Sequence, residues 1–229
     1  MGSLQKTLFI ATALTATAAG ASGKPKPQID LEHTICIRLY NQAAVRLETL
    51  KWATVDVTRI YASSGINIAW EQPITETQED RGIDMSSAPL PGRQRERPYV
   101  AVRILPRTAA NIVPGALGFA LPFAQTGAQV SVFYDRVEAT ARSQNATPYV
   151  VLGYAIAHEI GHVLLRFSEH SAAGLMQARW NQTTWRLATD GLLAFLPEQK
   201  QRIRIAVLKF TALRESPEHA TILAPSEMP

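Results

Sequence analysis

The residues best suited to chemistry in this sequence are histidines that lie close together. The chain of 229 residues has five histidines, and three of them are His158, His162 and His170. The first two stand four positions apart in the run His-Glu-Ile-Gly-His, which we expect to be helical. Side chains at positions i and i+4 of an α-helix project from one face on neighbouring turns, so two imidazoles placed there can bind the same metal ion.

Glu159 stands between these two histidines and projects from a different face of the expected helix. Its carboxylate can lie beside a bound ion without binding it, accept a proton from an attacking water and donate it to a leaving amine. The alternative is a buried helix with incidental histidines, but burying two imidazoles and a carboxylate without partners is costly. The His-Glu-x-x-His spacing therefore predicts zinc (Zn²⁺) as the cofactor, His158 and His162 as ligands, and Glu159 as the catalytic base.

A catalytic zinc ion uses three protein ligands and keeps one position open for water. His170 is our prediction for the third ligand, because it follows His162 by eight residues and lies beyond an expected end of the helix at 166–168. An acid on a later segment, Asp190 or Glu198, is the alternative, as in sites with two histidines and one glutamate.

The elements that must position this site begin with a strand, a helix and a second strand. Residues 33–40 and 66–70 are apolar or alternating runs that are typical of strands. Between them, apolar residues recur at helical spacing after Asn41, a candidate N-cap, as far as Gly65, a candidate C-cap. A strand, a helix and a strand of these lengths predict a βαβ unit with parallel strands.

Two further strands are expected at 99–105 and 129–134. Between them lies a segment with several glycines, 106–128, which we expect to flank a cleft. A short helix is expected at 136–143, with Asp135 as a candidate cap.

The helix that carries the histidines has the strongest signal. Thr147 and Pro148 offer a hydroxyl cap followed by a proline in the first turn. Residues 149–157 are apolar on most faces of a helix, which is typical of a buried one. With a last helix expected at 196–213, the elements predict an α+β fold with a mixed, twisted sheet.

The composition is that of an ordinary globular protein. Apolar residues make up 46% and charged residues 18% of the chain, which is sufficient for one core. The formal net charge of +4 is mild and its basic residues are scattered, so we expect no nucleic-acid partner. The single cysteine, Cys36, stands between two isoleucines and is expected to be buried.

Residues 1–23 have the features of a secretory signal peptide, with Lys6, an apolar run and then small residues. We therefore expect a secreted or periplasmic protein that has no stable membrane association after the signal is removed. The mature chain, 24–229, is expected to be a single catalytic domain. We expect an upper subdomain at about 30–165, a lower one at about 166–213 and a frayed tail at 214–229.

The histidine motif, His170 and the run Gly174-Leu175-Met176 together resemble the metzincin clan of zinc endopeptidases, and most closely its small secreted bacterial members. The resemblance implies a zincin-like fold with a long active-site helix, a third histidine beyond a turn, and Met176 in a tight turn beneath the metal. It also implies that His158, His162 and His170 are the ligands and Glu159 the base.

The sequence departs from the clan's pattern at three positions. Leu165 stands where the clan usually has a glycine, and Ser168 stands where it has the third histidine, so that His170 comes two residues late. Ala178 stands where some members have a tyrosine, so we assign no tyrosine to transition-state stabilisation.

These features predict a secreted zinc metallopeptidase, a hydrolase that cleaves peptide bonds in a peptide or protein substrate. We expect an extended substrate to add along an edge strand, 129–134, through main-chain hydrogen bonds. Two alternatives use the same motif: a secreted zinc-binding protein without catalysis, and a zinc amidase that acts on a non-peptide substrate. A closed site with four ligands would favour the zinc-binding alternative.

Overall fold

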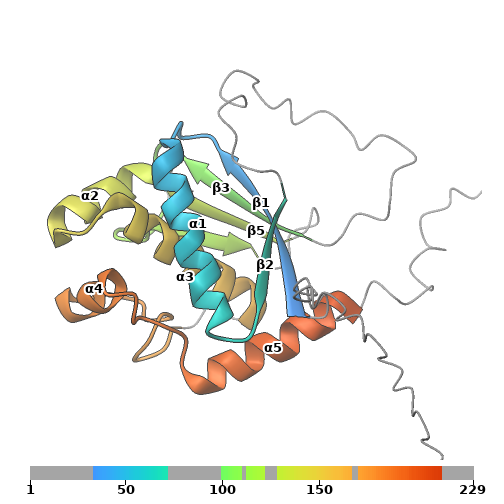
Figure 1. Cartoon of the computed structure of the whole chain (residues 1–229). Helices are drawn as coiled ribbons and strands as arrows, with labels where there is room; N and C mark the ends of the chain where they lie inside the picture. The colour runs from blue at the N-terminus through green and yellow to red at the C-terminus, as the bar shows by residue number, and fades with distance from the viewer. Residues whose placement is uncertain (1–32, 72–98, 110–111, 122–127, 167–169, 213–229) are drawn as a thin grey trace, which may run out of the picture.

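The computed structural model describes residues 33–71, 99–109, 112–121, 128–166 and 170–212. The expected signal peptide at 1–23 and the expected tail at 214–229 lie outside these residues and stay predictions. The described elements, in chain order, are β1 (Thr34–Asn41), α1 (Leu47–Ala62), β2 (Asn67–Glu71), β3 (Tyr99–Leu105), β4 (Gly118–Leu121), β5 (Gln129–Phe133), α2 (Tyr134–Gln144), α3 (Pro148–Leu165), α4 (Gln182–Thr189) and α5 (Pro197–Ala212) (Figure 1).

The described strands form one sheet in the order β2-β1-β3-β5-β4. β1 pairs in parallel with β2 and with β3, and β3 pairs in parallel with β5, whereas β4 runs antiparallel to β5. The expected βαβ unit is confirmed, because α1 joins the parallel neighbours β1 and β2. The described residues thus form an α+β fold with a mixed sheet, in agreement with the sequence.

The position of β5 in the sheet corrects one expectation. The expected edge strand, 129–134, coincides with β5, but β5 lies inside the sheet, between β3 and β4. The edge on this side is β4, which lies within the segment 106–128 that was expected only to flank a cleft. β4 has four residues, too few for the alternation that reveals a strand in a sequence, and it is held by its pairing with β5.

The helix α3 lies in the core, with α1 packed against it and with β4 and β5 also in contact (Figure 1). A Cβ atom at Gly153 would lie 2.8 Å from the backbone oxygen of Ala53, so the absence of a side chain there lets α1 and α3 approach closely. α3 is long and apolar enough for a membrane span, yet 83% of that window is buried inside the protein, as in a core helix.

The sheet contributes aliphatic side chains to the same core as α1 and α3. They belong to one cluster with the buried residues of the two helices, and each fully buried side chain of this size contributes about 1.5–3 kcal/mol to folding. These strand residues are Ile35, Ile37, Val100, Val102, Ile104, Val130 and Val132. Cys36 is also buried and is not disulfide-bonded, as expected.

The ends of α1 differ from the expected caps. Asn41 does not cap this helix, which begins at Leu47. Its side-chain amide instead makes two hydrogen bonds of 2.9 Å with the backbone of Val45 and so closes the turn between β1 and α1. The helix ends at Ala62, and Gly65 lies in the following turn with a φ of 74°.

The start of α2 also differs, because the helix begins at Tyr134, one residue before the expected cap. The carboxylate of Asp135 accepts hydrogen bonds from the backbone N–H and the hydroxyl of Thr108, at 3.1 Å and 3.0 Å. Asp135 therefore connects the end of β3 to α2 rather than capping the helix.

The C-terminal part contains one helix that was not expected. α4 is short, and Asn181 caps it by accepting a hydrogen bond of 2.9 Å from the N–H of Thr184. α5 matches the helix expected at 196–213 to within one residue at each end, with Ile203 and Val207 buried as its pattern predicts.

Candidate metal centre

His158 and His162 lie on neighbouring turns near the end of α3, and their rings face each other. The ring centroids are 4.8 Å apart and the two Nε2 atoms are 3.1 Å apart. Tetrahedral zinc holds nitrogen ligands at about 2.0–2.1 Å, which places two such nitrogens about 3.3–3.4 Å from each other. The two rings therefore already have nearly the separation that a shared ion requires.

His170 joins this pair from the segment that follows α3. One ring nitrogen from each of the three histidines lies within 4.8 Å of the others. The centroid of the His170 ring is 5.3 Å from that of His158 and 4.9 Å from that of His162. At the end of α3, Arg166 takes a left-handed conformation with a φ of 56°, which ends the helix before the chain returns to the site.

The alternative third ligands, Asp190 and Glu198, do not belong to this group. Asp190 is the C-cap of α4 and Glu198 lies in the first turn of α5, and both are exposed. Among the described residues, the group that could hold a metal ion consists of the three histidines. The geometry therefore favours His170 over either acid, although it comes two residues later than the clan's spacing.

A hydrogen bond from His158 to the following turn sets the state of its ring. Nδ1 of His158 lies 2.8 Å from the carbonyl oxygen of Leu175. Because a carbonyl only accepts hydrogen bonds, Nδ1 carries the proton and the lone pair of the neutral ring is on Nε2, which faces His162. Hydrogen bonds of this kind fix the ring orientation of metal-binding histidines.

Met176 lies against α3 between the two helical histidines. A Cβ atom at Gly161 would lie 2.6 Å from the sulfur of Met176, and Met176 itself is fully buried. The turn around it is held by a hydrogen bond of 2.8 Å from the N–H of Leu175 to Ala194 and by another of 2.8 Å from the N–H of Ser171 to Met176. Met176 is therefore part of a turn that packs against Gly161 of α3 as well as part of the core.

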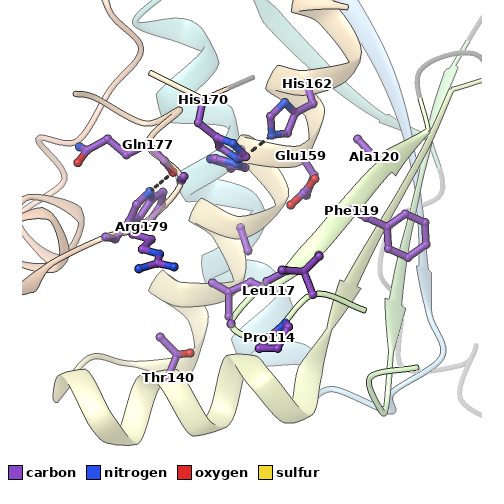
Figure 2. Close-up of a pocket in the computed structure, with 18 of the residues that line it drawn as sticks. Pro114, Leu117, Phe119, Ala120, Thr140, Glu159, His162, His170, Gln177 and Arg179 are labelled. Carbon is purple, nitrogen blue, oxygen red and sulfur yellow. Dashed lines mark hydrogen bonds between the residues drawn. The ribbon is translucent and has the colours of Figure 1, made fainter. Parts of the chain in front are cut away.

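The side chain of Glu159 is also closely packed, and 7% of the surface of this residue is exposed. A Cβ atom at Gly118 would lie 3.3 Å from Oε1 of Glu159 and 2.4 Å from the backbone oxygen of Ser131. Glycine at the start of β4 thus leaves space for the carboxylate. Figure 2 shows Glu159 between the histidines and the strand that carries Ala120.

Burial shifts the ionisation of the site toward neutral side chains. It lowers the pKa of His158 to about 4, although the hydrogen bond to Leu175 opposes this and the other two histidines add to it. Burial also lowers the pKa of His170 and raises the pKa of Glu159 to about 8. At neutral pH His158 is therefore unprotonated, which is the state that binds a metal, and the shift of His170 favours the same state. A divalent cation would favour ionised Glu159.

The three histidines and Glu159 line one cavity of about 1130 Å³ (Figure 2). Its walls come from three parts of the chain: residues 113–120 with β4, polar residues of α2, and the segment after Met176. The residues of that segment are Gln177, Ala178, Arg179 and Trp180. The site is therefore open to a molecule larger than water.

Two residues around the site have no place in the sequence-based prediction: Arg179 and Trp180. Gly118 was expected only as part of the segment 106–128, whose residues 113–120 line the cavity as predicted. The rings of Trp180 and His158 meet edge-on, with their centroids 6.2 Å apart. The Nε1–H of Trp180 donates a hydrogen bond of 3.1 Å to the carbonyl of Gln177. The position of Trp180 shortly after Met176 was the available signal. No local pattern signalled the contact between Gly118 and Glu159, because that contact depends on β4 lying beside α3.

No protein-family model matches this sequence, and no curated protein matches it either. The function must therefore be inferred from the geometry and chemistry of the site.

The contact between Gly161 and Met176 leads to a prediction about stability. Gly161→Ala should destabilise the protein by about 1–3 kcal/mol, because the new methyl group overlaps the methionine sulfur. In a Met176→Ala background the same change should cost less, because only the contact of the methyl group with the ring of Phe195, at 3.0 Å, remains and alanine is the better helix former by about 1 kcal/mol. Urea unfolding of the four proteins measures this coupling.

Gly153→Ala is the matched control, because its methyl group would meet the backbone of α1 instead of Met176. Its effect should be the same with and without Met176→Ala. An equal cost of Gly161→Ala in both backgrounds would contradict the proposed contact.

The ionisation of Glu159 leads to a second prediction, for the metal-free protein. The unfolded chain ionises this carboxyl near its ordinary pKa of 4.5, whereas the folded protein keeps the proton up to about pH 8. Stability is therefore lost as pH rises from about 4.5 to about 8. Glu159→Gln should remove this loss, so its advantage over the unmodified protein should grow across that window to a few kcal/mol, at about 1.4 kcal/mol per pKa unit.

Thermal unfolding in the presence of EDTA at several pH values measures this difference. Glu48→Gln, at an exposed position in the first turn of α1, is the control and should show no such trend. A difference for Glu159→Gln that does not change with pH would show that this carboxyl is not buried as described.

Proposed function

We propose that this protein is a zinc-dependent peptidase with a metzincin-like catalytic site. The observation that carries the proposal is the convergence of three imidazoles beside a buried glutamate in one open cavity. His158 and His162 come from one helix and His170 from the segment after it, which is the arrangement that the motif and the resemblance to metzincins imply.

The donor set fits zinc. Three neutral imidazole nitrogens are typical of catalytic zinc sites that keep a fourth position for water or substrate. The cavity beside the histidines supports such an open position, whereas a purely structural zinc site is closed by four protein ligands. Zinc bound here would polarise a substrate carbonyl and lower the pKa of water.

Glu159 is the residue that we expect to transfer the proton. It lies on α3 between the two histidines, it faces the cavity, and its place beside Gly118 keeps it close to β4. In the proposed reaction its carboxylate takes a proton from the attacking water as the water oxygen bonds to the peptide carbon. The same proton is then given to the amine as the carbon–nitrogen bond breaks.

The edge of the sheet next to the site suits an extended peptide. β4 pairs with β5 on one side, and among the described strands none pairs with its other side. A substrate strand added there would gain main-chain hydrogen bonds irrespective of its sequence. This proposal replaces the expected use of residues 129–134, which are inside the sheet. Because the sequence predicts a signal peptide, we also propose that the activity is secreted or periplasmic.

The decisive experiment combines zinc content with peptide cleavage. We expect the purified protein to contain about one zinc ion per chain and to cleave peptides of a mixed library. Glu159→Gln should keep the zinc and lose cleavage by about 10²–10⁴-fold, the usual contribution of a general base. Mass spectrometry of the products and metal analysis give the two readouts.

Glu48→Gln is the control variant for this experiment and should cleave like the unmodified protein. Equal cleavage by the Glu159 variant would remove this residue from the mechanism. Zinc binding without cleavage of any peptide would instead favour a zinc-binding protein, and hydrolysis of only non-peptide amides would favour an amidase.

A further inference from the structure

Among the described residues that line the cavity, cationic side chains outnumber anionic ones. Within this described lining, the only acid is Glu159, which the proposed reaction already uses, whereas both Arg166 and Arg179 are cationic. A substrate that fills this cavity therefore meets positive charge beyond the reacting atoms. Arg179 is the residue whose position can be argued in detail.

Arg179 extends into the cavity from a segment whose backbone is fixed on both sides. Before it, Gln177 donates from its side chain to the carbonyl of Gly174 at 3.0 Å. After it, Trp180 donates to the carbonyl of Gln177, and Asn181 caps α4. Figure 2 shows the guanidinium group pointing into the cavity, with Thr140 of α2 on the far side.

Two arginines that lie outside the cavity, Arg59 and Arg38, have donors that are occupied. Arg59 binds the carboxylate of Asp56 at 2.9 Å and the carbonyl of Gly191. Arg38 binds Glu71 at 2.8 Å. In contrast, the structure gives Arg179 neither a hydrogen bond nor an ion pair with any residue of the described part, although it stands in the cavity.

We propose that Arg179 binds a carboxylate of the substrate next to the bond that is cleaved. A guanidinium group can bind a carboxylate through two parallel hydrogen bonds. Arg179 is exposed and lines the cavity, so its donors are accessible to a bound substrate. The carboxylate is either the side chain of Asp or Glu or the free C-terminus of a peptide. This inference rests on the proposed peptidase function, and it makes Arg179 a determinant of specificity.

The test compares peptides that differ in one carboxylate. One pair has Glu or Gln near the cleaved bond with an amidated C-terminus, and a second pair is neutral with either a free or an amidated C-terminus. The zinc-loaded protein is tested for kcat/KM. Its Glu159→Gln variant is tested for peptide Kd, which measures binding without cleavage.

We expect one of the two carboxylate sources to improve kcat/KM and Kd by about twofold to fivefold, because Arg179 is exposed and solvent screens its ion pair. Arg179→Ala should abolish this preference, Arg179→Lys should keep only part of it, and Arg179→Glu should reverse it in favour of a Lys-containing peptide. Arg186→Ala is the matched control, because Arg186 is exposed on α4 and does not line the cavity.

The outcomes separate this inference from the proposed function. Cleavage without a carboxylate preference, or with a preference that survives Arg179→Ala, would overturn the role of Arg179 and leave the peptidase intact. Arg179-dependent binding of acidic peptides without any cleavage would support the anion site and reject the peptidase. Neither cleavage nor such binding would overturn both.

Discussion

The candidate site depends on one hydrogen bond, from Nδ1 of His158 to the carbonyl oxygen of Leu175. It fixes the tautomer of the ring, so that Nε2 offers its lone pair toward the other histidines. It also joins α3 to the turn that contains Met176. A hydrogen bond from the N–H of Leu175 connects this turn to the carbonyl of Ala194. This contact therefore couples the tautomer of His158 to the turn that follows His170, which the hydrogen bonds of Leu175 and Ser171 also hold in place.

Three glycines allow other parts of the chain to approach α3 at the required distances. Gly153 admits α1, Gly161 admits the sulfur of Met176, and Gly118 of β4 leaves space for the carboxylate of Glu159. Each glycine inside the helix costs about 1 kcal/mol relative to alanine. The helix is instead stabilised by burial on nearly all sides, which explains how it can tolerate two glycines so near the histidines.

The sequence predicted those features that depend on local pattern. The proline at 148, the continuous apolar run and the i, i+4 histidines were sufficient for α3 and for the pairing of His158 with His162. The expected hydroxyl cap was wrong, because Thr147 is the N-cap residue but its side chain makes no capping hydrogen bond. Local patterns of this kind did not predict β4. This strand is too short to show alternation and is held by its pairing with β5. The edge strand was misassigned for the same reason, because a strand's neighbours in a sheet depend on contacts between distant parts of the chain.

The electrostatics of the site link the proposed metal to the proposed substrate. Without a metal, burial keeps His158 unprotonated and Glu159 protonated at neutral pH, so these two groups are neutral. A bound dication together with ionised Glu159 would leave a net charge of +1, and Arg179, which lines the same cavity, would add to it. Since positive charge in a cavity attracts anions, the filled site should favour a substrate that brings a carboxylate. In the proposed mechanism, the charge of the metal that keeps Glu159 ionised and the charge of Arg179 would therefore attract a carboxylate into the same cavity.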